Sequence, residues 1–158
     1  MVRARVEKKD PDALHFLGFK YYNGQPELRK DMGRAVKLWE EAAELGSIAA
    51  LFKLGVSYEY GEGVQEDHAK AIHFYKMAAM QGHAESRYNL ACCEGKKGNY
   101  DRAFRHLLIS AKMGCSMSVG QIKVRFMGGI ATKKTACPST EWIPEEMKSH
   151  ERKNEAKK

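Results

Sequence analysis

The sequence predicts an all-α protein, a right-handed α-α superhelix (solenoid) of about seven repeat helices plus a C-terminal helix. Two observations predict this fold. Patterns of small and apolar residues recur at offsets of 36 and 37 residues, which is typical of helical repeats. No proline occurs between Pro26 and Pro138, and this favours helices because an interior proline costs about 3 kcal/mol.

The helices of each repeat are predicted from two patterns. Residues 13–24 follow Ala-x-x-x-Leu-Gly-x-x-Tyr-x-x-Gly, and residues 50–61 repeat all five of the named positions. Residues 35–46 and 71–82 share the second pattern, Ala-x-x-x-(Trp or Tyr)-x-x-Ala-Ala-x-x-Gly. Spacings of three and four place the apolar residues on one helical face. The small residues then let helix axes approach closely around large neighbours.

The predicted large neighbours are Tyr21, Tyr58, Trp39 and Tyr75. Helix ends are predicted as well. Gly46, Gly82 and Gly114 follow second helices, where a left-handed conformation favours glycine, and Asp67 and Asp101 precede second helices as N-caps.

The predicted organisation has three parts: an N-terminal lead-in at 1–11, a solenoid at 12–130 and a C-terminal capping segment or tail at 131–158. The solenoid is divided into units 12–48, 49–84, 85–116 and a partial unit 117–130. Pro138 and Pro144 interrupt the place where the second helix of the partial unit would lie. A last helix near 145–156 either covers the open end or is a solvated tail.

Residues 50–82 carry the repeat pattern almost whole, and this pattern resembles the Sel-one-like repeat family. The third unit is closer to the related tetratricopeptide repeat, because its connection, Gly-Asn-Tyr-Asp-Arg-Ala, is short. The resemblance covers about residues 12–130 and implies a protein-interaction module. It extends to short proteins that carry a RING zinc domain ahead of such repeats, although no RING cysteine array is present here.

The resemblance also implies a concave face, lined by residues two before, two after and five after the leucine of each Leu-Gly pair. The candidate partner-binding residues at these positions are His15, Phe19, Tyr22, Phe52, Val56, Glu59, Tyr88, Cys92, Val124 and Met127. Lys96 is added to them because this basic residue falls near the same face. An exposed apolar face would bind an amphipathic helix or an extended peptide. The alternative is that these side chains pack between neighbouring first helices.

Positive charge is concentrated in the third unit. Residues 1–86 hold 12 Lys and Arg against 13 Asp and Glu, whereas residues 87–134 hold 10 against 2, a net charge of +8. The candidate basic patch consists of Arg87, Lys96, Lys97, Arg102, Arg105, Lys112, Lys123 and Arg125. Such a patch would attract an acidic protein partner, and nucleic acid is disfavoured because no nucleic-acid-reading motif is present. The alternative is a solvated face.

Neither catalysis nor a cofactor is expected. The histidines are scattered, and no serine or cysteine stands in a nucleophile elbow. His106 and Ser110 share a helical face, but such a pair alone is usually surface or packing. Cys92 and Cys93 are adjacent and lack the spacing of a zinc pair. The chain is therefore predicted to be no enzyme, with no metal and no small-molecule substrate.

No signal peptide or membrane-spanning segment is predicted, so a cytoplasmic or nuclear location is expected. The sequence thus leaves three hypotheses. The first is a scaffold or adaptor that binds a protein or peptide on the concave face. The second is an electrostatic binder that uses the basic third unit. The third is a structural module of a larger, ubiquitin-ligase-like assembly.

Overall fold

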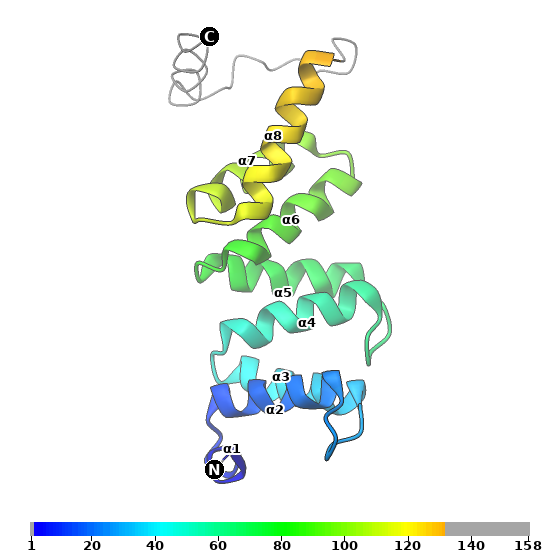
Figure 1. The fold of residues 1–158 in the computed structure, drawn as a ribbon, viewed down its shortest axis with the longest axis vertical. Helices are drawn as coiled ribbons and strands as arrows, with labels where there is room; N and C mark the ends of the chain where they lie inside the picture. Colours follow the sequence, from blue (N-terminus) through cyan, green and yellow to red (C-terminus); the bar gives the residue numbers. More distant parts are fainter. Residues whose placement is uncertain (1, 132–158) are drawn as a thin grey trace. The chain divides into compact units, whose positions relative to one another are not determined.

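The computed structural model describes the backbone of residues 2–131 and the side chains of residues 4–124. Over this range the protein is helical, with no strand, and the predicted all-α solenoid is confirmed (Figure 1). The helices are α1 (Val2–Glu7), α2 (Pro11–Asn23), α3 (Met32–Glu44), α4 (Ile48–Tyr60), α5 (His68–Met80), α6 (Ala84–Lys96), α7 (Tyr100–Lys112) and α8 (Ser116–Ala131). The expected helix near 145–156 lies outside the described residues.

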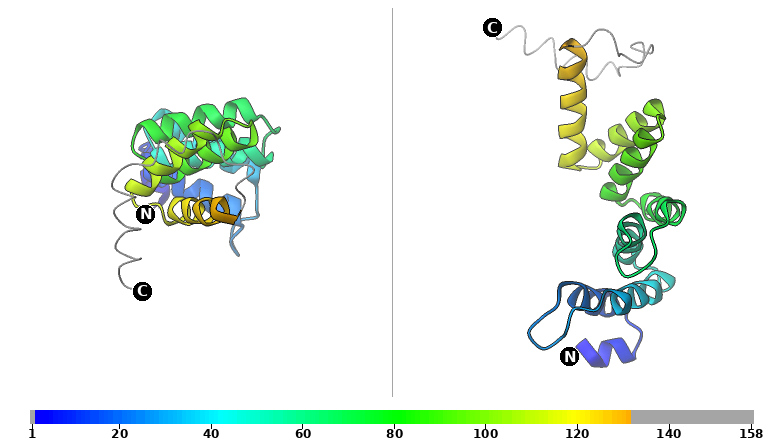
Figure 2. Two further views of the ribbon diagram at one scale, coloured as in Figure 1. Left: turned by 90° about the horizontal axis from the view of Figure 1, so that it is seen from above. Right: turned by 90° about the vertical axis from the view of Figure 1, so that its right-hand side faces the viewer.

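The chain divides into two compact units, Met1–Ile122 and Lys123–Lys158. In the first unit, each helix from α2 to α6 packs against the next helix in chain order. The contacts are most extensive within the pairs α2–α3, α4–α5 and α6–α7, which are the three structural repeats. Figure 2 shows these pairs from two further sides.

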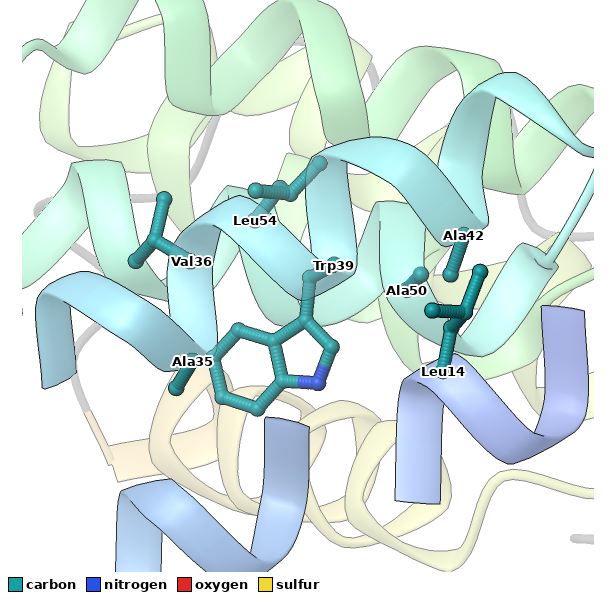
Figure 3. Packing of buried hydrophobic residues seen from close by; sticks show 7 residues of the cluster. All are labelled: Leu14, Ala35, Val36, Trp39, Ala42, Ala50 and Leu54. Atoms are coloured by element: carbon teal, nitrogen blue, oxygen red, sulfur yellow. The ribbon is translucent and has the colours of Figure 1, made fainter. Parts of the chain in front are cut away.

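The first repeat is organised around Trp39 of α3, which is 1 % exposed. Figure 3 shows it with the other buried residues of its cluster, among them Leu14 of α2 and Leu54 of α4. The indole nitrogen donates a 3.2 Å hydrogen bond to the backbone oxygen of His15. The ring also lies directly on Gly18, where a Cβ atom would come within 2.5 Å of the indole nitrogen. Glycine at this position therefore sets the distance between α2 and α3.

The second repeat uses the same arrangement with different residues. Tyr75 of α5 is fully buried, and a Cβ atom on Gly55 of α4 would overlap its ring. The predicted pairing of a small residue with a large neighbour is therefore confirmed in both repeats. Because the large ring occupies the space left by glycine, the two helices of each pair are close-packed.

The predicted helix ends are confirmed with one exception. Gly46, Gly82 and Gly114 have φ angles of 92°, 91° and 93°, and the carboxylate of Asp67 accepts a 3.1 Å hydrogen bond from the backbone nitrogen of Lys70. The prediction for Asp101 is wrong, because α7 begins at Tyr100 and its N-cap is Asn99, two residues before the predicted one.

A side-chain contact across the connection explains this exception. The amide nitrogen of Asn99 donates a 2.8 Å hydrogen bond to Glu94, so the short connection is held to the end of α6. Asp101 lies instead in the first turn of α7, where its negative charge interacts favourably with the helix dipole.

The lead-in contains a short helix, α1, which the sequence did not predict. A six-residue helix shows no amphipathic period, so tertiary contacts must stabilise it. Val6 packs against the core of the first repeat, and Arg5 forms a 2.6 Å salt bridge with Asp10, the N-cap of α2. These contacts join the lead-in to the first repeat.

Candidate partner-binding surface

The residues predicted for the concave face differ in exposure. Phe19 is 41 % exposed, and Lys96 is exposed as well. Glu59 is buried. Six further residues are half-buried: His15, Tyr22, Phe52, Val56, Tyr88 and Cys92. Val124 is exposed and belongs to the second compact unit, and the side chain of Met127 lies outside those described.

Three of these residues meet around one lysine. The ammonium nitrogen of Lys53, on α4, lies 5.5 Å from the ring centroid of Phe19, 5.9 Å from that of Phe52 and 6.0 Å from that of Tyr22. A cation at these distances is attracted by the negative faces of the rings. We call Phe19, Tyr22, Phe52 and Lys53 the aromatic surface. It joins the first helices of the first and second repeats.

Lys53 was not among the residues predicted from the sequence. The concave-face rule selects positions two before, two after and five after the leucine, and Lys53 stands one before Leu54. Lys53 directly follows Phe52, a predicted aromatic residue of this face, and has a long cationic side chain. These two features would have identified it as a candidate. Such a chain can lie along an apolar face while its head stays near water.

Tyr22 is held in place from three sides. Its hydroxyl donates a 2.9 Å hydrogen bond to Glu62, in the connection after α4, and this bond raises the pKa of Tyr22. Its ring lies 5.7 Å from the ring of Trp39, and the ammonium group of Lys30 lies 5.8 Å from its centroid. The aromatic surface is therefore fixed to the core of the first repeat.

Phe52 belongs both to the packing between helices and to the aromatic surface. Its ring lies 4.9 Å from the imidazole of His83 and 6.2 Å from the ring of Tyr75. Val56 and Phe52 both pack against the core of the second repeat. These contacts agree with the alternative that Phe52 packs between neighbouring helices. The ammonium group of Lys53 nevertheless lies over its ring at the surface.

Glu59 is buried, whereas a residue that contacts a partner on the concave face would be exposed. One carboxylate oxygen accepts a 2.7 Å hydrogen bond from the hydroxyl of Tyr75, and the other accepts a 3.1 Å bond from the ammonium group of Lys96. The bond to Glu59 raises the pKa of Lys96. Because its carboxylate is used inside the protein, Glu59 supports the fold here rather than facing a partner.

The third repeat contributes less open surface. Tyr88 of α6 is half-buried, and burial raises the pKa of its hydroxyl, with Cys92 close by. The aromatic surface therefore belongs to the first two repeats, whereas Tyr88 packs beside Cys92.

The basic patch predicted from the sequence is not one uniform surface. Arg87 is half-buried and donates a 3.3 Å hydrogen bond to the backbone oxygen of Ala79, while Lys96 is bound to Glu59. Besides Lys96, the exposed members are Lys97, Arg102, Arg105, Lys112 and Lys123, the last of which belongs to the second compact unit. The side chain of Arg125 lies outside those described.

The residues considered for other chemistry have structural contacts. The hydroxyl of Ser110 donates a 2.7 Å hydrogen bond to the backbone oxygen of Ala84, so it is not aligned as a partner of His106. Within residues 4–124, no three His, Cys, Asp or Glu side chains are grouped to hold a metal ion. None of the helices in the described part is both long and apolar enough to cross a membrane.

Comparison with known proteins identifies the repeats. The family model described as Sel1 repeat matches residues 11–47, 48–83 and 84–115. Two solved structures are similar. A Sel1 repeat protein from Oxalobacter formigenes gives a TM-score of 0.69 at 28 % identity, over 77 % of this chain and 49 % of that one. The protective antigen c5321 of uropathogenic Escherichia coli gives 0.72 at 28 % identity, over 80 % of this chain and 28 % of that one.

Curated relatives are similar over shorter segments. The chitin synthase regulator SKT5 of Malassezia restricta is 38 % identical over 82 residues, which are 51 % of this chain and 6 % of the relative. The ERAD-associated E3 ubiquitin-protein ligase component HRD3B of Arabidopsis thaliana is 37 % identical over 57 residues, 36 % of this chain and 9 % of the relative. The segments matched are thus less than a tenth of either relative.

Proposed function

Because this chain belongs to the Sel1 repeat family, we propose that it is a non-catalytic adaptor that binds a segment of a partner protein on the first-helix face of the solenoid. The observation that carries this proposal is the aromatic surface. There Phe19 is 41 % exposed beside the half-buried rings of Tyr22 and Phe52. Aromatic side chains dominate the energetics of protein interfaces because each one buries a large area on binding.

The rigidity of this surface supports the proposal. Trp39 fills the space beside Gly18 on α2, and Tyr75 fills the space beside Gly55 on α4. Both helices that carry the aromatic surface are therefore close-packed against their second helices. A surface that is already ordered loses little conformational entropy when a partner binds, and this favours affinity.

The names of the relatives support the same class of function. One is a regulator of chitin synthase and another is a component of a ubiquitin ligase, so both names describe action through another protein. We extend only this general property to the present chain. The absence of catalysis is part of the proposal, and it agrees with the bond of Ser110 to a backbone oxygen.

Site-directed photocrosslinking tests the proposal. A photoreactive phenylalanine analogue replaces Phe19 in the full chain, and in a control variant it replaces Lys37, which is exposed on α3. Each variant is irradiated in a cell extract at about 1 M salt, where the Debye length is about 3 Å and exposed charges are screened. We expect discrete crosslinked proteins from position 19 and none of these from position 37. Identical products from both positions would contradict the proposal.

A second candidate function rests on the charge of the third repeat. Lys97 and Arg102 are exposed, and residues 87–134 carry a net charge of +8. An acidic partner held by such exposed charges would dissociate as salt rises. If crosslinked partners are found only at low salt and are lost in the Lys97→Glu, Arg102→Glu variant, this second function is favoured over the first.

A further inference from the structure

Lys53 places a cation in the middle of an apolar surface. Its ammonium group lies within about 6 Å of the ring centroids of Phe19, Tyr22 and Phe52. None of the carboxylates with described side chains forms a salt bridge with it. Cation–π attraction holds the charge in place but leaves its capacity to donate hydrogen bonds open.

Two more lysines extend this cationic character. The ammonium group of Lys30 lies 5.8 Å from the Tyr22 centroid, and that of Lys20 lies 4.9 Å from the centroid of Phe16. Phe16 is 46 % exposed and stands one helical turn before Phe19 on α2. Positively charged ammonium groups therefore lie over rings of α2 and α4, although residues 1–86 have a net charge of −1.

One acidic side chain beside this surface, that of Glu62, has another contact. The carboxylate of Glu62 accepts the hydroxyl of Tyr22. His15 is half-buried on α2. Burial is the main cause that lowers the pKa of His15. The charge of Lys53 lowers this pKa further, whereas the charge of Asp12 raises it. Lys53 is therefore the charged group that lies over all three rings of the aromatic surface.

We infer that the segment bound on the aromatic surface carries a carboxylate that pairs with Lys53, between apolar side chains that pack on Phe19 and Phe52. This inference rests on the proposed function and names the chemistry of its partner. The apolar side chains would supply most of the affinity. The carboxylate would supply selectivity, because a charge-assisted hydrogen bond among rings is screened less than one in open water.

A peptide carboxylate fits this surface better than a phosphate or a nucleic acid. The cations over these rings are lysines, whereas bidentate recognition of phosphate favours the planar fork of arginine. A nucleic acid would require several cations along its backbone. Lys53 is the ammonium group that lies over all three rings of the aromatic surface, and this arrangement suits one acidic residue with apolar neighbours.

Selection from a random-peptide display library tests this inference on the full chain. The chain is used as wild type and as the variants Phe19→Ala and Lys53→Met, in which methionine keeps the apolar stem and removes the charge. Lys70→Met is the matched control, because Lys70 of α5 lies 5.1 Å from the ring centroid of Tyr58, away from the aromatic surface. Circular dichroism confirms that each variant is folded before use.

We expect the wild type to select peptides with an Asp or Glu beside apolar residues. Replacing that acidic residue by its amide should weaken binding to the wild type about tenfold or more, the range of a charge-assisted hydrogen bond. The Lys53→Met variant should bind the acid and amide forms equally, and Lys70→Met should behave like the wild type.

Four outcomes would overturn the inference. Peptides that require Phe19 but show no acidic preference, or whose acidic preference survives Lys53→Met, would overturn it and leave the proposed function standing. A stronger preference for phosphorylated peptides than for carboxylate peptides would overturn the chemistry assigned to the partner. If no selected peptide requires Phe19, the proposed function itself fails, and the inference fails with it.

Discussion

The hydroxyl of Tyr75 on α5 donates a 2.7 Å hydrogen bond to the buried carboxylate of Glu59 on α4. The second oxygen of this carboxylate accepts a bond from Lys96 on α6, whose side chain is 66 % exposed. One carboxylate thus joins the two helices of the second repeat to the first helix of the third. A buried charge is tolerated there because both of its oxygens have donors.

Removing different members of this group should destabilise the protein to different extents. Glu59→Ala leaves the buried hydroxyl of Tyr75 without an acceptor, and we expect it to cost about 2–3 kcal/mol. Tyr75→Phe should cost about 1–2 kcal/mol, because Lys96 still satisfies the carboxylate. Lys96→Ala should cost less than about 1 kcal/mol, as exposed ion pairs do. Urea unfolding of the three variants measures this order, and a Lys96→Ala cost equal to that of Glu59→Ala would contradict it.

The contact between Gly55 and Tyr75 predicts a compensating pair of mutations. Gly55→Ala places a methyl group against the tyrosine ring and should cost about 1–3 kcal/mol or more by overpacking. The third repeat has Ala91 and Leu107 at the corresponding positions, both buried. Adding Tyr75→Leu to Gly55→Ala should therefore cost less than the sum of the two single changes, despite the loss of the Tyr75 hydroxyl.

Gly120→Ala is the control for this experiment. Gly120 lies within α8, and a Cβ atom there meets nothing within 4 Å. Alanine should stabilise the helix by up to about 1 kcal/mol at that position. Thermal unfolding separates the effects: equal costs for Gly55→Ala and Gly120→Ala would show that the contact with Tyr75 is not decisive.

Three histidines should make the protein less stable in mild acid. Burial lowers the pKa of His15, His83 and His106 in the folded state. For His106, the charges of Arg87 and Lys76 act in the same direction. Since the unfolded chain binds more protons below its histidine pKa of about 6.5, the free energy of unfolding should fall as the pH falls through that value.

Each histidine contributes at most about 1.4 kcal/mol per pH unit to this fall. Unfolding free energies measured between about pH 5 and 8 give the slope. His106→Gln should reduce the slope. A stability that rises as the pH is lowered through this range would refute the prediction.

The adjacent cysteines of α6 should differ in reactivity. Cys93 is buried, and burial together with the charge of Glu59 raises its pKa to about 11. Cys92 is half-buried. Because the thiolate is the reactive form, iodoacetamide should modify Cys92 before Cys93 in the native protein. Mass spectrometry after timed labelling measures both sites. Equal labelling before unfolding would be inconsistent with the buried position of Cys93.

The repeat spacing predicted the fold because the packing within each helix pair depends on residues that are close in the sequence. Gly18 and Gly55 recur at the same place in the pattern, and so do Trp39 and Tyr75, so the close pairs could be predicted from the amino-acid sequence alone. Helix ends at glycine were equally predictable, since a positive φ restricts the choice of residue. Asn99 was missed because its bond to Glu94 replaces the usual capping interaction.

The candidate site was less predictable because it depends on neighbours from other repeats. The partners of Glu59 are 16 and 37 residues away, so the sequence alone did not indicate that its carboxylate is buried and shared. The place of Lys53 depends on how far a flexible side chain extends towards the rings of α2. Helical periodicity gives the direction of a residue from its helix, but not which side chains cover it.

The most direct test of partner binding on the aromatic surface is calorimetric titration at high salt. The segment of a partner crosslinked at position 19 is titrated into the wild type and into Phe19→Ala, with equal melting temperatures established first. An aromatic residue central to binding should contribute about 2 kcal/mol or more, so the Kd should rise about thirtyfold in the variant. Equal Kd values for the two proteins would contradict the account and place the partner elsewhere on the solenoid.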